Sequence, residues 1–111
     1  SPDRFLPEKC TLPPTGIACL DSTASTTAIS LVIQNSGGFS MSNVSVSLDG
    51  TGCVATATGP TALENGEKGT YVAACTLTGG TKYKGTLSVN YKNVDTDLPH
   101  TETGDLIKRV P

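Results

Sequence analysis

The chain has 111 residues, a formal net charge of −2 at pH 7 and only 16% charged residues. That length predicts a single domain, and the charge argues against nucleic acid or an anionic membrane surface as a partner. Trp is absent, Phe occurs twice, and Ser and Thr make up about a quarter of the residues. Because Thr and Val favour strands and helix-forming residues are few, the composition predicts an all-β domain.

The first 15 residues are rich in proline and contain Pro2, Pro7, Pro13 and Pro14. Proline lacks a backbone N–H and interrupts both helices and central strands. We therefore expect residues 1–15 to form an extended lead-in without regular structure, followed by one domain over residues 16–111. Phe5 and Leu6, the large apolar residues of the lead-in, are expected to pack on the edge of that domain.

Turn signals divide the domain into segments that favour strands, at residues 16–21, 27–35, 43–49, 53–58, 69–78, 82–92 and 100–110. Residues 21–25 are predicted to be a polar turn. In the second segment Ile29, Leu31 and Ile33 share one face, and in the last Leu106 and Val110 are the expected inward pair. Such alternation predicts sheets with one buried face and one wet face.

Seven short strands and no convincing helix indicate an immunoglobulin-like antiparallel β-sandwich of about seven strands. The signature of antibody domains, a buried Trp beside a cysteine pair that joins the sheets, cannot apply because Trp is absent. An eight-stranded barrel is the alternative, which the strand count slightly disfavours.

Four cysteines occur without any Cys-x-x-Cys spacing, and His100 is the single histidine. This pattern favours disulfides in an exported protein over a metal site. Cys10 and Cys19 flank a Pro-Pro-Thr-Gly turn, whereas Cys53 and Cys75 lie on strands among small alanines that leave room for a bridge. We predict Cys10–Cys19, which ties the lead-in to the first strand, and Cys53–Cys75, which joins two strands well inside the sandwich.

Catalytic and metal-binding patterns are weak. His100 lies near Asp97 and Glu102, but no Ser or Cys stands in a nucleophile motif, so an exposed structural histidine is expected. The carboxylates of Asp95 and Asp97 give a thin calcium signal that lacks the further ligands of a calcium loop. The sequence therefore predicts a non-enzymatic protein with no catalytic residue, cofactor or metal.

The remaining polar groups have ordinary structural explanations. Gly37-Gly38 is not a phosphate-binding loop, since no helix follows it, and Glu64, Glu67 and Lys68 flank a solvated turn. Three lysines on one strand are interpreted as protection of a sheet edge against unwanted pairing: Lys82, Lys84 and Lys92. Asn43-Val44-Ser45 is an N-glycosylation sequon, so Asn43 is a candidate glycosylation site.

Two resemblances to known families accompany these patterns. The segments SLVIQNSGG, NVSVSLDG and LENGEKGTYVAAC resemble Ig-like adhesion modules of bacterial and archaeal surface proteins, in which a strand ending in Asn-x-Gly-Gly precedes a valine-alternating strand and a Leu-x-x-Gly-Glu turn. SPDRFLPEKCTLPPTGIACLD at the start, together with residues 82–110, resembles the extracellular part of archaeal type IV pilin-like proteins. In that family a class III signal peptide and one apolar helix precede a segment like residues 5–10.

The pilin-like resemblance implies an extracellular structural or adhesive headpiece whose N-terminal helix lies outside this chain. It implies contacts with other pilin-like subunits, and with the membrane, through that helix alone. Surface glycans or proteins are the other expected partners, and the isolated domain is expected to be a monomer. The alternative is an Ig-like accessory module of a larger secreted protein that binds a glycan or a protein.

The sequence contains no signal peptide, and its longest apolar stretches are much shorter than the ~20 residues of a membrane-spanning helix. Since disulfides require export, we expect either that a leader has been removed or that the chain is an ectodomain separated from its anchor.

Overall fold

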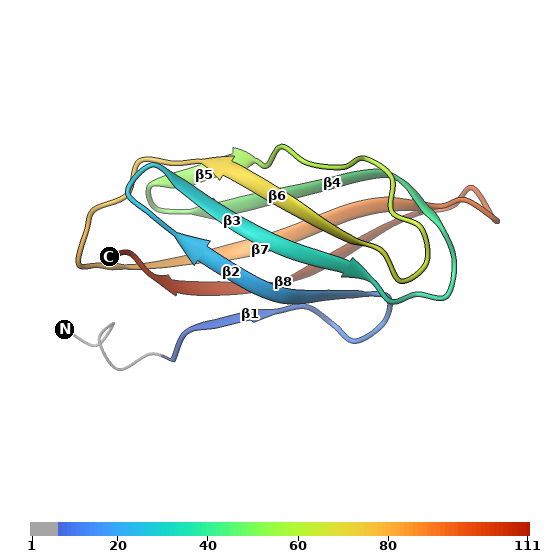
Figure 1. The fold of residues 1–111 in the computed structure, drawn as a ribbon, viewed down its shortest axis with the longest axis horizontal. Helices are drawn as coiled ribbons and strands as arrows, with labels where there is room; N and C mark the ends of the chain where they lie inside the picture. The colour runs from blue at the N-terminus through green and yellow to red at the C-terminus, as the bar shows by residue number, and fades with distance from the viewer. Residues whose placement is uncertain (1–6) are drawn as a thin grey trace.

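The computed structural model describes residues 7–111, so Phe5 and Leu6 lie outside the described residues. The fold is all-β and consists of two antiparallel sheets packed face to face (Figure 1). Its strands are β1 (Lys9–Thr11), β2 (Ile17–Ala24), β3 (Ala28–Asn35), β4 (Met41–Gly50), β5 (Cys53–Thr56), β6 (Lys68–Ala74), β7 (Lys82–Asn93) and β8 (Pro99–Arg109). The predicted all-β sandwich is confirmed.

The larger sheet has the strand order β1-β8-β7-β4-β5, and the smaller has the order β2-β3-β6. The chain crosses between the sheets after β1, β3, β5 and β6, and every strand pair is antiparallel. Two separate sheets with such crossings make an immunoglobulin-like sandwich rather than a barrel. The edge strands on one side of the sandwich are β1 of the larger sheet and β2 of the smaller sheet. On the other side they are β5 of the larger sheet and β6 of the smaller sheet.

The number of strands is eight rather than seven, because the lead-in contributes β1. Lys9–Thr11 pairs antiparallel with Asp105–Ile107 of β8. The carboxylate of Glu8 lies 2.9 Å from Nζ of Lys108, and the hydrogen bond to Lys108 lowers the pKa of Glu8. The prediction that the whole lead-in lacks regular structure was wrong, because three residues between prolines suffice to pair with an existing strand edge.

The predicted turn at residues 21–25 was also wrong, since β2 continues to Ala24. The register of β2 on β3 shifts between Cys19 and Asp21, so one extra residue is accommodated as a bulge. The turn itself lies one step later, where the N–H of Ser25 donates to the carbonyl of Ala28 at 2.8 Å.

The core lies between the two sheets and follows the predicted alternation. Ile29, Leu31 and Ile33 are fully buried on β3. Leu106 and Val110 are fully buried as well, which confirms the inward pair predicted at the C-terminal end. Three tyrosines complete this otherwise aliphatic core: Tyr71, Tyr83 and Tyr91.

Two buried tyrosines bring hydroxyl groups into the interior, and each hydroxyl has a backbone partner. The hydroxyl of Tyr71 donates to the carbonyl of Pro60 at 2.6 Å, and that of Tyr83 donates to the carbonyl of Cys53 at 2.9 Å. Burial, and to a smaller degree the carboxylates of Glu67 and Asp49 respectively, raises the pKa of each phenol to about 12.

These raised pKa values predict a loss of stability in base. The ordinary pKa of tyrosine is about 10, so the contribution of the neutral phenols is complete below pH ~10 and is lost as the pH rises to ~12. We expect the melting temperature to fall in that interval, by the equivalent of about 2 kcal/mol per tyrosine. Thermal melts of the wild type and of Tyr71→Phe/Tyr83→Phe between pH 8 and 12 measure this effect. Identical slopes in the two proteins would contradict it.

The sandwich is elongated, with extents of 47 × 23 × 18 Å. The C-terminus and the start of β1 lie near one end of the long axis (Figure 1). At the opposite end, next to the β1–β2 connection, lie three connections at residues 36–40, 64–67 and 94–98, which together are here called the distal end. Backbone hydrogen bonds join these connections, from the N–H of Asn35 to the carbonyl of Glu67 and from the N–H of Val94 to the carbonyl of Ser40.

Candidate functional site

The two cysteine pairs of the structure are Cys10–Cys19 and Cys53–Cys75, the pairs predicted from the sequence. Cys10 lies on β1, the first strand of the larger sheet, and Cys19 lies on β2, the first strand of the smaller sheet. Their Cα atoms are 5.9 Å apart. This disulfide therefore joins the two sheets along one side of the sandwich, rather than only fixing a lead-in.

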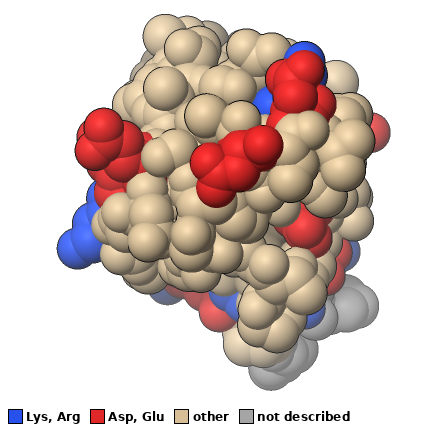
Figure 2. Space-filling view, turned by 90° about the vertical axis from the view of Figure 1, so that its right-hand side faces the viewer, with Lys and Arg blue, Asp and Glu red and all other residues tan. Residues whose placement is uncertain are grey.

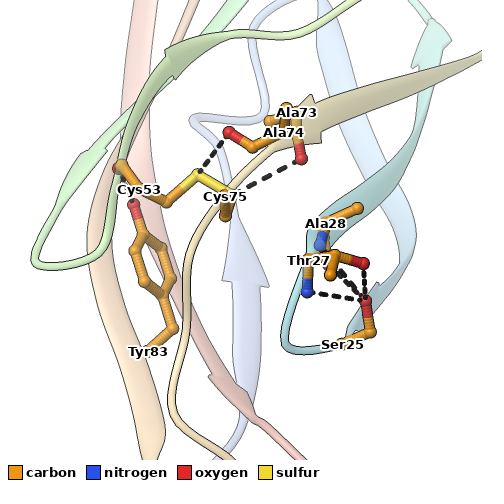
Figure 3. The surroundings of a disulfide bond; sticks show 8 residues. All are labelled: Ser25, Thr27, Ala28, Cys53, Ala73, Ala74, Cys75 and Tyr83. Carbon is orange, nitrogen blue, oxygen red and sulfur yellow. Dashed lines mark hydrogen bonds between the residues drawn. A yellow bond between two sulfur atoms is a disulfide. The ribbon is translucent and has the colours of Figure 1, made fainter.

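The second disulfide joins the sheets along the opposite side. Cys53 begins β5 and Cys75 directly follows β6, so the bridge connects the last strand of each sheet. Figure 3 shows the bridge beside the ring of Tyr83, whose hydroxyl holds the carbonyl of Cys53. Cys53 is 2% exposed and Cys75 is half-buried. The prediction that the Cys53–Cys75 bridge lies well inside the sandwich was wrong, because both disulfides join strands at the edges of the two sheets.

The three lysines of β7 do not protect a sheet edge. β7 lies between β8 and β4 in the larger sheet and is therefore an inner strand: it pairs with β8 from residue 82 to residue 92, and with β4 from residue 85 to residue 93. The edge interpretation of Lys82, Lys84 and Lys92 was therefore wrong. Nζ of Lys92 lies 3.3 Å from Oδ1 of Asp97 in the connection between β7 and β8.

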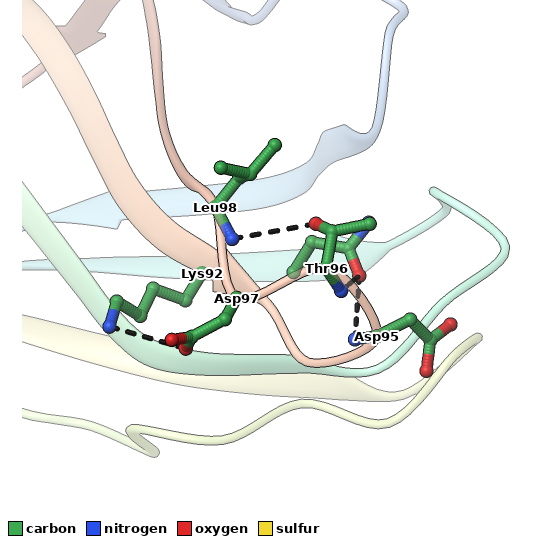
Figure 4. A network of polar contacts seen from close by, with 6 residues as sticks. Lys92, Asp95, Thr96, Asp97 and Leu98 are labelled. Atoms are coloured by element: carbon green, nitrogen blue, oxygen red, sulfur yellow. Dashed lines mark hydrogen bonds and ion pairs between the residues drawn. The ribbon is translucent and has the colours of Figure 1, made fainter.

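The carboxylates of Asp95 and Asp97 do not point toward one another (Figure 4). Oδ1 of Asn93 accepts hydrogen bonds from the N–H groups of Asp95 and Thr96, so an asparagine side chain organises the turn. Figure 4 shows the Asp95 carboxylate pointing away from Asp97, which faces Lys92. No group of three or more potential metal ligands occurs within residues 7–111.

His100 is exposed and stacks on the ring of Tyr91, with ring centroids 5.4 Å apart. The hydroxyl of Tyr91 donates to Oε1 of Glu102 at 3.4 Å, and burial together with Glu102 raises the pKa of that phenol. The structure thus brings His100 and Glu102 to the same tyrosine. Within the described part of the chain, no serine or cysteine is hydrogen-bonded to the histidine ring, so the arrangement is a stacked pair and not a nucleophile–base pair.

Asn35 is a structural residue that the sequence analysis missed. Its side chain is fully buried, and Nδ2 donates to the carbonyls of Phe39 at 2.6 Å and Leu63 at 3.0 Å. Its Oδ1 accepts the N–H of Gly37 at 3.0 Å. One amide thereby holds the 36–40 connection together with Leu63, the residue directly before the 64–67 connection. The signal was the Asn-x-Gly-Gly at the end of the strand, which was noted only as a family resemblance.

The distal end carries separate charged groups on a mostly uncharged surface (Figure 2). Glu64, Glu67 and Lys68 are exposed there, as predicted for a solvated turn. Oε1 of Glu67 accepts the N–H of Glu64 at 2.9 Å, and Oδ1 of Asn65 accepts the N–H of Gly38 at 3.1 Å. The Gly37-Gly38 segment is thus hydrogen-bonded to a neighbouring connection of the distal end.

A hollow of about 440 Å³ lies at the end of the sandwich opposite the distal end. Residues of the β4–β5 turn, of the segment between β6 and β7, and of the start of β7 line it: Thr51, Gly52, Thr76, Leu77, Thr78, Thr81, Lys82, Tyr83 and Lys84. It is open to solvent and holds no histidine, cysteine or carboxylate. The geometry gives a surface for contacts and no converging set of reactive groups.

Asn43 lies on β4 and is exposed.

Residues 7–111 contain no helix, so no part of this range forms a membrane-spanning helix. Comparisons of the chain with protein-family models, with curated proteins and with solved structures give no match.

Proposed function

We propose that the domain is a non-enzymatic structural or adhesive module of the cell surface, the headpiece of an archaeal type IV pilin-like subunit. The observation that carries the proposal is the closure of both sides of an elongated sandwich by disulfides. Disulfides persist in oxidising compartments outside the cytosol. Each one covalently links two strands that belong to different sheets.

The direction of the chain supports the same proposal. β1 begins near the end that holds the C-terminus, and the three distal connections lie at the other end (Figure 1). A helix placed before the lead-in, as the pilin-like resemblance implies, would join the domain at the first end. The distal connections would then point away from the filament or membrane, where an adhesive surface is needed.

The encoded sequence before Ser1 tests the proposal directly. We expect about 20 consecutive apolar residues preceded by a short basic leader. We also expect the protein in sheared surface filaments, detected by peptide mass spectrometry. A second folded domain before Ser1, with the protein soluble in the medium, would instead support an Ig-like accessory module of a larger secreted protein.

The isolated domain is expected to be a monomer. Within residues 7–111 the exposed large apolar residues lie on four different segments of the fold: Leu20 on β2, Val54 on β5, Val72 on β6, and Val94 and Leu98 in the β7–β8 connection. Stable self-association usually needs a larger contiguous apolar surface. Light scattering at micromolar concentration should give a mass close to 11.4 kDa. A stable dimer would contradict this expectation.

A further inference from the structure

We propose that Asn43 is an acceptor for an N-linked oligosaccharide, transferred from a lipid-linked donor during export. The inference rests on the export of the chain, which the proposed function requires, and not on its assembly into filaments. Asn43-Val44-Ser45 is the one Asn-x-Ser/Thr sequence among the 111 residues. Three observations on β4 support it.

The first observation is a bulge that turns Asn43 outward. Ser42 pairs with Lys92 and Ser45 pairs with Asn90, so Asn43 and Val44 together face a single residue of β7. Asn43 adopts a left-handed conformation with φ of 51°, which asparagine tolerates better than most residues. The extra residue shifts the alternation of β4, so that Asn43 is exposed while Val44 is buried.

The second observation is that both recognition groups lie on the outer side of β4. Asn43 and Ser45 flank the buried Val44, and both belong to the outer surface of the larger sheet. The N–H of Val44 donates to the carbonyl of Thr61 at 2.8 Å, which holds this part of β4 in place from its other edge. The amide to be modified and the hydroxyl that a transferase reads are therefore presented together.

The third observation separates Asn43 from the other asparagines. Four of the five use their side chains within the fold: Asn35, Asn65, Asn90 and Asn93. The side chain of Asn43 forms no hydrogen bond with any residue from 7 to 111. An amide that holds no turn or strand in place can be modified without the loss of a structural hydrogen bond.

The transfer forms one bond and breaks one. Nδ2 of Asn43 attacks the anomeric carbon of the first sugar of a polyprenyl phosphate- or pyrophosphate-linked oligosaccharide. The bond from that carbon to the phosphate oxygen breaks, and the polyprenyl phosphate or pyrophosphate leaves with the electron pair. The amide loses one proton to a base of the transferase or to solvent, so neither an oxidant nor a reductant is required. The glycan would stand near the start of β4, close to the distal end.

In the first test the full chain, behind a cleavable signal sequence, is translated in the presence of microsomes that contain an oligosaccharyltransferase. In the second test the same protein is secreted from a yeast host. The wild type and Ser45→Thr should each give a species of higher mass that a glycosyl-asparagine amidase removes. Asn43→Gln and Ser45→Ala should lose that species completely. Asn90→Gln, on the neighbouring strand and outside any sequon, is the matched control and should keep it.

Asn43→Gly distinguishes acceptance of a glycan from a purely structural use of asparagine in the bulge. Glycine keeps the left-handed backbone, so this variant made in bacteria should melt within about 2 °C of the wild type, yet carry no glycan in microsomes. An imported wild-type chain with unmodified Asn43 in the microsomes would overturn the proposal, whether or not the protein is later secreted. That result would leave the surface function standing, because export and the disulfides do not depend on a glycan.

Discussion

Asn35→Ala is expected to lower the free energy of unfolding by about 3–5 kcal/mol, the largest effect of any single side chain outside the apolar core. The substitution removes two donors and one acceptor at a fully buried position. The carbonyls of Phe39 and Leu63 and the N–H of Gly37 then lose their partners. Each buried polar group without a partner costs about 1–3 kcal/mol.

Thermal and denaturant unfolding measure this loss. At about 4 °C per kcal/mol for a domain of this length, the melting temperature should fall by well over 10 °C. Asn90→Ala is the matched control, because Asn90 is exposed and its Oδ1 accepts one hydrogen bond, from the hydroxyl of Thr101. That variant should lose about 1 kcal/mol or less. Similar losses of unfolding free energy in the two variants would mean that water replaces the hydrogen bonds of the Asn35 amide at the distal end.

Removal of the Cys53–Cys75 disulfide is expected to destabilise the domain more than removal of Cys10–Cys19. Loop-closure entropy gives about 3.4 kcal/mol for the longer loop and about 2.6 kcal/mol for the shorter one. Replacement of the nearly buried Cys53 by alanine also removes packing beside Tyr83, whereas Cys10 and Cys19 are both half-buried. β1 is only three residues long and contributes no fully buried residue, so its detachment from β8 would remove little core packing.

Melts of the two double variants provide the measurement. Cys53→Ala/Cys75→Ala should lower the melting temperature by well over 10 °C, and Cys10→Ala/Cys19→Ala should lower it less and keep the fold. Reduction of both bridges removes roughly 6 kcal/mol, which approaches the net stability of many domains of this size. A larger loss from the N-terminal pair would show that β1 holds the two sheets together more strongly than its length suggests.

The amino-acid sequence by itself determined the strands and their faces. The alternation through Ile29, Leu31 and Ile33 requires a strand with one buried face, and Leu106 with Val110 follows the same rule. These patterns are local, since side chains alternate with a period of two wherever a strand forms beside a core. The small alanines beside Cys53 and Cys75 indicated a bridge for a similarly local reason, because small neighbours leave room for a disulfide between two strands.

Only the tertiary structure decided what depends on partners far along the chain. Lys9–Thr11 is a strand because Asp105–Ile107 offers it an edge, and no local preference predicts that pairing across some 95 residues. The central place of β7 and the lateral position of both disulfides depend on strand order, which alternation does not encode. Asn35 was predicted only as the last residue of a strand. Its structural role appeared once the carbonyls of Phe39 and Leu63 converged on its amide, because a buried polar side chain takes its role from the backbone groups that surround it.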